Sequence, residues 1–143
     1  MNTPLIIDTS AFISLGSITD SNYKKAQFIS SRIKKENRKI IVPGDIFTET
    51  MNVIGRQIGH KGAIIQAKNI FLDRSLSIAE MTSQIRQRAL DKFKKQSESV
   101  SFTDCIVMAF ADEYETKEIF GFDDAFRKNG YIRIGIDKNP LAP

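Results

Sequence analysis

Short apolar runs alternate along this chain with longer segments in which apolar residues recur at helical spacing. The runs at residues 5–7 and 40–42 are entirely aliphatic, which is typical of strands buried on both faces of a parallel sheet. A weakly marked strand lies at 75–79, a further strand lies at 118–122, and the alternating residues 131–136 predict an edge strand. The pattern therefore predicts up to five strands.

Helices separate the predicted strands throughout. Apolar residues recur three or four positions apart over about 10–15, 21–37, 44–58, 63–72, 82–93 and 103–111, and residues 123–130 form a turn or a single helical segment. The segment from Gly59 to Gly62 interrupts two of these helices and predicts a helical hairpin. Alternating strands and helices indicate an α/β fold with a parallel sheet. Because the sequence contains no internal linker or repeat, we expect one domain over residues 1–143.

The cysteine and histidine content limits the chemistry open to this protein. Its 143 residues include one cysteine, Cys105, and one histidine, His60, so an internal disulfide and a zinc cage are both excluded. A metal would therefore be held by oxygen, and catalysis by a pair of histidines is excluded as well. The chain has no glycine-rich phosphate loop. It also has no apolar run of the roughly 18 residues that span a membrane, so we expect a soluble cytoplasmic protein.

A formal net charge of +4 is compatible with a polyanionic partner. The cations concentrate in two segments, which contain Lys24, Lys25, Arg32, Lys34, Lys35, Arg38 and Lys39, and Arg86, Arg88, Lys92, Lys94 and Lys95. Each segment is either a surface that binds nucleic acid or the solvated face of an amphipathic helix. The group Lys34, Lys35, Arg38 and Lys39 is the first candidate for a nucleic-acid contact.

Four acidic residues occupy similar places near the ends of predicted strands. Asp8 follows the first strand, Glu49 lies a little over one turn into the helix after the second, Asp104 opens an apolar helix, and Asp123 follows the strand at 118–122. In parallel sheets, functional groups gather outside the carboxyl ends of the strands, so all four side chains could face one cleft. Each acid also has a structural alternative. Asp8 could cap a helix, Asp104 could be the N3 partner of Ser101 in a capping box, Asp123 could be a turn or N-cap residue, and Glu49 could face solvent.

The joint arrangement of these acids favours a binding site over packing. Clustered carboxylates repel one another unless a cation neutralises them. Mg²⁺ and Mn²⁺ prefer oxygen ligands, and such ions activate water for attack on a phosphodiester. The candidate metal ligands and catalytic residues are therefore Asp8, Glu49, Asp104 and Asp123.

These motifs, taken in order, resemble those of the PIN-domain family. They are Leu5 to Ser10, Pro43 followed by Glu49, Ser101 to Cys105 with Ala109 and Ala111, and Gly121 to Phe126. The resemblance spans nearly the whole chain, and the order and spacing are most similar to those of VapC-type toxins of toxin–antitoxin pairs. It implies a three-layer α/β/α domain with four to five parallel strands and a Mg²⁺- or Mn²⁺-dependent ribonuclease.

The resemblance also implies roles for individual acids. Asp8, Glu49 and Asp104 match the acidic core of the family, and Asp123 matches its fourth acid. The adjacent Asp124 leaves that last assignment open, although the spacing to the following phenylalanine favours Asp123. One metal ion or two would be held by this set.

Further implications concern the substrate and the partners. Ser10 or Thr103 would hold a ligand oxygen or the scissile phosphate, and cleavage of RNA would leave a 5′-phosphate and a 3′-hydroxyl. The family pattern also implies a small antitoxin whose tail fills the acidic site, and a homodimer. Phe12 and Phe28 are among the apolar candidates for such contacts, but we expect them in the core. The alternative function is a catalytically weak RNA-binding or regulatory module.

Overall fold

The computed structural model describes residues 3–138 of the chain, and each predicted strand and helical segment has a counterpart there. The strands are β1 (Leu5–Ile7), β2 (Ile40–Pro43), β3 (Leu76–Ala79), β4 (Glu118–Phe120) and β5 (Ile132–Arg133). The helices are α1 (Thr9–Gly16), α2 (Tyr23–Lys35), α3 (Gly44–Ile58), α4 (His60–Leu72), α5 (Ser83–Phe93), α6 (Phe102–Glu113) and α7 (Asp124–Lys128). The predicted α/β class is confirmed.

The five strands form one parallel sheet in the order β3-β2-β1-β4-β5. In the central strand β1, Ile6 is paired with Ile41 of β2 and with Ile119 of β4. All three residues of β1 are buried because helices cover both faces of the sheet, which explains why this strand contains no polar residue.

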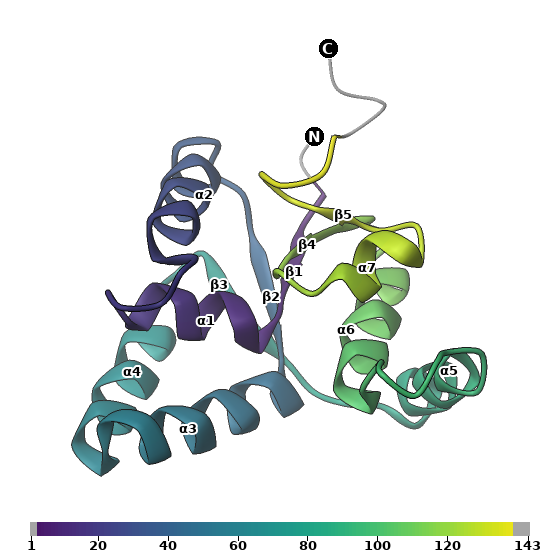
Figure 1. Ribbon diagram of the computed structural model, residues 1–143, viewed down its shortest axis with the longest axis horizontal. Helices are drawn as coiled ribbons and strands as arrows, with labels where there is room; N and C mark the ends of the chain where they lie inside the picture. Colours follow the sequence, from purple (N-terminus) through teal and green to yellow (C-terminus); the bar gives the residue numbers. More distant parts are fainter. Residues whose placement is uncertain (1–2, 139–143) are drawn as a thin grey trace.

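Side chains that alternate along the strands divide the core into two clusters. On one face, Ile6, Ile41 and Ile119 pack with α6 and with residues of α5 and α7. On the other face, Leu5 and Ile7 pack with residues of α1 and α2. Figure 1 shows the same layers, with α1 and α2 on one side of the sheet and α5, α6 and α7 on the other. This is the predicted three-layer arrangement.

Helices α3 and α4 form the predicted hairpin, but α4 begins at His60 and not at Ala63. Gly59 alone, with a φ of 97°, makes the bend between the two helices, so the following residues are free to continue as helix. His60 is exposed, as expected, although it lies on a helix and not in a turn. Within residues 3–138, no helix has both the length and the apolar character that crossing a membrane requires.

Strand β5 is shorter than its alternating sequence predicts and contains two residues, Ile132 and Arg133. The Arg133 carbonyl accepts hydrogen bonds from the backbone N–H groups of Ile136 and Asp137. Gly135 adopts a φ of 77° within this turn. The chain therefore leaves the sheet at a point where the side-chain pattern alone predicts continued pairing.

One aromatic residue that we expected in the core lies on the surface. Phe28, on α2, is 64% exposed, whereas Phe12 is partly buried against both core clusters. The other large exposed apolar side chains of the helical layers include Ile65 in the middle of α4, and Phe71 and Leu72 at its end.

Candidate active site

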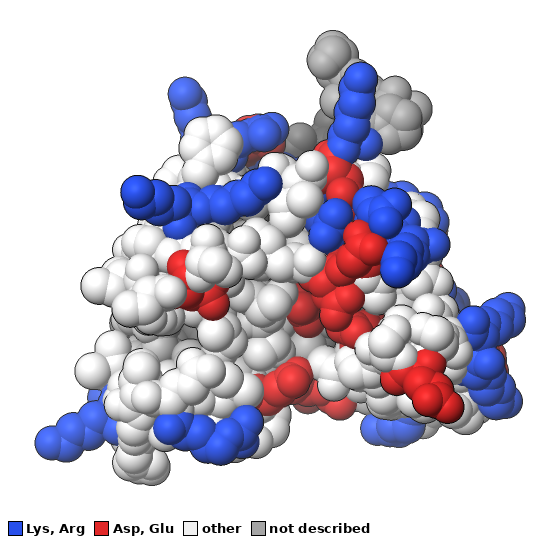
Figure 2. All heavy atoms as spheres, in the orientation of Figure 1, with Lys and Arg blue, Asp and Glu red and all other residues white. Residues whose placement is uncertain are grey.

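Four elements bring the predicted acids to the carboxyl edge of the sheet. Asp8 follows β1 directly, Glu49 lies in the second turn of α3 after β2, and Asp123 follows β4. Asp104 reaches the same edge from the N-terminal end of α6, because the other end of this helix leads through a short connection to the start of β4. In Figure 2, acidic side chains form a band across the middle of this face.

The acids act on one another electrostatically. Burial raises the pKa of Asp104 to about 6, and the charges of Asp123 and Asp8 add to the rise. Burial also raises the pKa of Asp8 to about 6, against hydrogen bonds from Ser10 that lower it, and the charge of Glu49 contributes. In the part of the chain that the structure describes, no basic side chain is ion-paired with any of the four acids. The four acids therefore act on one another as neighbours along this edge, and none of them has a protein counterion there among the described residues.

Asp8 is both the N-cap of α1 and a member of this acidic site. Its Oδ2 atom accepts hydrogen bonds from the Ser10 hydroxyl at 2.8 Å and from the Ser10 backbone N–H at 3.4 Å. The Ser10 hydroxyl also accepts a hydrogen bond from the backbone N–H of Phe122 at 3.1 Å. Ser10 therefore joins the ends of β1 and β4 and orients Asp8, while its contact with a ligand stays a prediction.

Glu49 is tied to the same edge by a residue that the sequence interpretation missed. The Thr9 hydroxyl donates a hydrogen bond to Oε2 of Glu49 at 2.9 Å, and Thr9 is buried. Because Glu49 is half-buried and its carboxylate accepts this hydrogen bond, it is not the unengaged solvent-facing helix residue of the structural alternative. The only sequence signal for Thr9 was its position between Asp8 and Ser10.

Replacing Thr9 with Val is expected to reduce activity of the acidic site about 10-fold, because Val keeps the shape of Thr and removes the donor that orients Glu49. Thr9→Ser, which keeps the hydroxyl, is the matched control and should retain most of the activity. The measurement is the rate of the RNA cleavage that the sequence resemblance implies, at several metal concentrations. Equal rates for the two variants would show that this hydrogen bond does not serve catalysis.

Asp104 forms a capping box with Ser101 at the start of α6, as the structural interpretation of its sequence position predicted. Its backbone N–H donates to the Ser101 hydroxyl at 3.1 Å, and its carboxylate accepts from the Ser101 backbone N–H at 3.3 Å. Thr103 is half-buried one position before it, so its predicted contact with a ligand is not tested by these hydrogen bonds. Cys105 is fully buried, and burial raises the pKa of its thiol to about 11, which suits packing and not chemistry.

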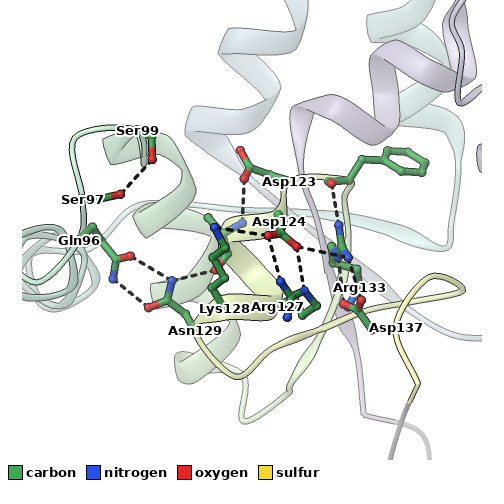
Figure 3. Close-up of polar contacts among 12 residues, drawn as sticks. Gln96, Ser97, Ser99, Asp123, Asp124, Arg127, Lys128, Asn129, Arg133 and Asp137 are labelled. Atoms are coloured by element: carbon green, nitrogen blue, oxygen red, sulfur yellow. Dashed lines mark hydrogen bonds and ion pairs between the residues drawn. The ribbon is translucent and has the colours of Figure 1, made fainter.

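The structure distinguishes Asp123 from Asp124. Asp123 caps α7 and acts electrostatically on Asp104. Asp124 points away from Asp123 and accepts two hydrogen bonds from Arg127, at 2.8 and 3.1 Å, with Arg133 at 3.6 Å (Figure 3). The hydrogen bonds from Arg127, followed by nearby positive charges, hold the pKa of Asp124 below its usual range. Asp124 is thus already neutralised, and the geometry favours Asp123 as the fourth acid.

The segment that carries Asp123 is fixed by two contacts that the sequence did not reveal. A Cβ atom at Gly121 would lie 2.9 Å from the Cβ of Asp8, so β4 comes this close only because residue 121 is glycine. Arg133 donates from Nη1 to the Phe122 carbonyl at 3.0 Å, and Asp137 holds the same guanidinium with two side-chain hydrogen bonds. Figure 3 shows Arg133 between Asp124 and Asp137.

The donor set suits a hard divalent cation. It consists of oxygen ligands only, and the raised pKa values of Asp8 and Asp104 show that their charged forms lack compensation. Within residues 3–138, no three acidic, histidine or cysteine side chains lie close enough together to hold a metal ion directly. An ion such as Mg²⁺ keeps several waters and needs only one or two direct carboxylates, so a partly water-mediated site fits this arrangement.

The first basic segment lies away from these acids. Helix α2 leads into the start of β2, so Lys34 and Lys35 lie at the amino edge of the sheet, opposite the acidic site. Arg38 is buried in an ion pair with Glu118 at 2.8 Å. The prediction that Arg38 contacts nucleic acid is therefore wrong, because its guanidinium is used within the fold.

Comparison with known proteins decides the family. The PIN domain family model matches residues 5–130. This chain belongs to the PIN-domain family. The predicted membership is confirmed, and the four motifs on which it rested lie at one edge of the sheet. No curated protein sequence matches the chain significantly.

A solved structure supports the PIN-domain architecture over almost the whole chain. The crystal structure of VapC20 from Mycobacterium tuberculosis, described as a sarcin-ricin loop cleaving toxin, matches with a TM-score of 0.78. The match covers 91% of this chain and 98% of that chain at 21% sequence identity. At this identity the likeness establishes a common fold.

Proposed function

We propose that this PIN domain is a divalent-metal-dependent endoribonuclease and the toxin of a VapBC-type toxin–antitoxin pair. One observation carries the proposal: acids from four separate elements meet at one edge of the sheet without a protein counterion. Such a site gains most from a hard cation, and phosphodiester hydrolysis is the reaction that such cations assist. Membership in the PIN-domain family and the fold shared with VapC20 support the choice of RNA as substrate.

In the mechanism we propose, the acids divide their roles by position. Asp8 and Asp104 would hold the Mg²⁺ or Mn²⁺ ion, with Asp123 binding directly or through water. When bound, the ion supplies Lewis-acid activation of the phosphate and of water. Glu49, whose carboxylate is oriented by Thr9, positions the attacking water or helps to hold a second ion. The products would carry a 5′-phosphate and a 3′-hydroxyl.

The same proposal includes a protein partner. A VapB-type antitoxin and a second copy of the chain would each need exposed apolar surface on this domain. The helical layers offer such surface, since Phe28 on α2 and Phe71 on α4 are 64% and 65% exposed. The acidic site would accept a basic side chain of the antitoxin in place of the metal.

The test is RNA cleavage by the purified protein with and without divalent metal. We expect cleavage with Mg²⁺ or Mn²⁺, its loss in excess EDTA, and its return when Mg²⁺ exceeds the chelator. End analysis of the products should show 5′-phosphates. Cleavage that continues unchanged in excess EDTA would contradict the proposed mechanism.

A catalytically weak RNA-binding module is the second candidate. It is favoured by the finding that, among the described residues, no three acidic, histidine or cysteine side chains are placed to hold a metal ion directly. Under this alternative the protein would bind RNA but would not cut it with Mg²⁺, Mn²⁺ or any mixture of the two. The same assay therefore separates the two functions.

A further inference from the structure

A second group of charged residues lies directly beside the acidic site, on α7. Arg127 and Lys128 follow Asp123 by four and five residues, which at about 1.5 Å of rise per residue places them roughly 6–8 Å farther along the helix. Their side chains are 53% and 68% exposed. Figure 2 shows basic side chains beside the acidic band on the flank where Figure 1 places α7.

The guanidinium of Arg127 is held in place and keeps a free edge. Asp124 accepts hydrogen bonds from its Nε at 2.8 Å and its Nη2 at 3.1 Å. Nη1 has no hydrogen-bond partner among residues 3–138. A guanidinium oriented in advance loses less conformational entropy when it binds a phosphate. Asp124 therefore orients this cation beside the acidic site.

The charge of this cluster remains positive after its internal pairing. Three cations, Arg127, Lys128 and Arg133, surround Asp124, and Asp137 pairs with Arg133, so three positive charges meet two negative ones. The cluster thus offers one net positive charge next to a site that we assign to a phosphodiester. Phosphate oxygens are the natural acceptors for such exposed cations.

Further basic residues continue from the end of α7 toward α5. Asn129 and Gln96 exchange two amide hydrogen bonds, at 2.8 and 3.0 Å, and Figure 3 shows this link between the two segments. Beyond it lies a cleft of about 340 Å³ lined by Arg88, Lys92 and Lys95 and also by Asp91, Asp112, Gln96 and Asn129. Arg88 and Lys92 are engaged with acidic residues of α6, whereas Lys95 forms no ion pair in the described chain.

We propose that Arg127, Lys128 and Lys95, here called the basic strip, bind the phosphate backbone of single-stranded RNA along the flank of the acidic site that α7 and the end of α5 form. This inference rests on the proposed function and identifies which flank of the acidic site the substrate covers. The basic strip takes the place of the lysines of α2 as the expected RNA contact, because those lysines lie at the opposite edge of the sheet. The strip contacts backbone charge, so it contributes affinity and orientation without reading sequence.

The experiment measures RNA binding in an Asp8→Asn background, so that the substrate is not cut. Fluorescence anisotropy of a labelled single-stranded RNA over a salt series gives the slope of log affinity against log salt. Each lost phosphate contact should flatten this slope by about 0.7. Arg127→Gln/Lys128→Gln should therefore flatten it by about 1.4, and Lys95→Gln, which leaves α7 untouched, by about 0.7.

Lys34→Gln/Lys35→Gln is the matched control, because it removes the same charge from the amino edge of the sheet. We expect its salt slope to equal that of the parent protein. The inference is overturned if the strip variants keep the parent slope, or if the α2 control flattens it as much as they do. An Asp8→Asn protein that binds no RNA even at low salt would instead refute the proposed function.

Discussion

Replacing Asp8 with Asn is expected to reduce RNA cleavage by at least about 100-fold while making the metal-free protein more stable. Loss of a residue that merely orients a metal ligand typically costs 10–100-fold, so loss of a ligand should cost more. The fold should survive, because Asn is as good an N-cap as Asp and its side-chain oxygen still accepts from Ser10. The measurements are cleavage rates with Mg²⁺ and the free energy of unfolding in EDTA.

The gain in stability follows from the raised pKa of Asp8. The folded protein holds the proton of this carboxyl up to about pH 6, whereas the unfolded chain releases it near 3.8. The contribution of Asp8 to stability is therefore full below pH 3.8 and is lost as the pH rises through 6. At pH 7 the buried charge opposes folding by about 3 kcal/mol, so Asp8→Asn should gain about this much at pH 7 and little at pH 4.

Asp73→Asn is a closely matched control. Asp73 accepts hydrogen bonds from the backbone and hydroxyl of Ser75, as Asp8 does from Ser10, but it precedes β3 at the amino edge. These hydrogen bonds and nearby lysines outweigh partial burial and lower the pKa of Asp73, so its charge supports folding at pH 7. The control should lose stability and keep its cleavage rate. A stability change of the same sign in both variants would contradict our account of the acidic site.

Gly121→Ala is expected to reduce cleavage about 100-fold and to destabilise the fold by about 1–3 kcal/mol. The new methyl group would lie 2.9 Å from Cβ of Asp8 and 3.0 Å from Cε2 of Phe126. Neither atom is the end of a flexible side chain, so β4 or Asp8 must shift, and overpacking of this kind costs 1–3 kcal/mol. Displacement of a catalytic group by about 1 Å is enough for a 100-fold loss.

The control is Gly55→Ala in α3, where an added Cβ meets nothing within 4 Å. This change should stabilise the protein by up to about 1 kcal/mol and leave cleavage unchanged, because Ala is favoured over Gly inside a helix. Thermal unfolding and initial cleavage rates are measured for both variants. If Gly121→Ala is as active as Gly55→Ala, the close approach of β4 to Asp8 is not required for function.

The sequence indicated the candidate acids wherever their positions follow a local rule. Asp8, Asp104 and Asp123 each stand at the start of an element, and helix caps and strand ends have local signatures. Thr9 carries no such signature of its function, since its partner Glu49 is 40 residues away. Arg133 likewise acts on the Phe122 carbonyl through a contact that only the sheet order creates.

For the basic residues, the sequence shows which segments are rich in cations but not where those segments lie in the fold. Composition correctly identified the segments rich in cations, but it carries no information about the edge of the sheet at which each segment lies. Arg38 illustrates this, since its burial against Glu118 depends on α2, β2 and β4 meeting at the amino edge. Arg127 and Lys128 are only two adjacent cations, so the sequence does not distinguish them as a basic segment. The fold nevertheless places them on α7, which begins next to Asp123.

By itself the sequence determined the α/β class, the helices and strands in outline, and the places of four acids near the strand ends, because hydrophobic periodicity and capping are local properties of the chain. The tertiary structure decided the strand order, the pairing of Asp124 and not Asp123 with arginines, and the edge of the sheet at which each basic segment lies. These features depend on contacts between residues far apart in the chain, and no local pattern encodes them. Gly121 depends on both, since it is a single residue of the sequence whose lack of a side chain matters only because the end of β4 packs against Asp8.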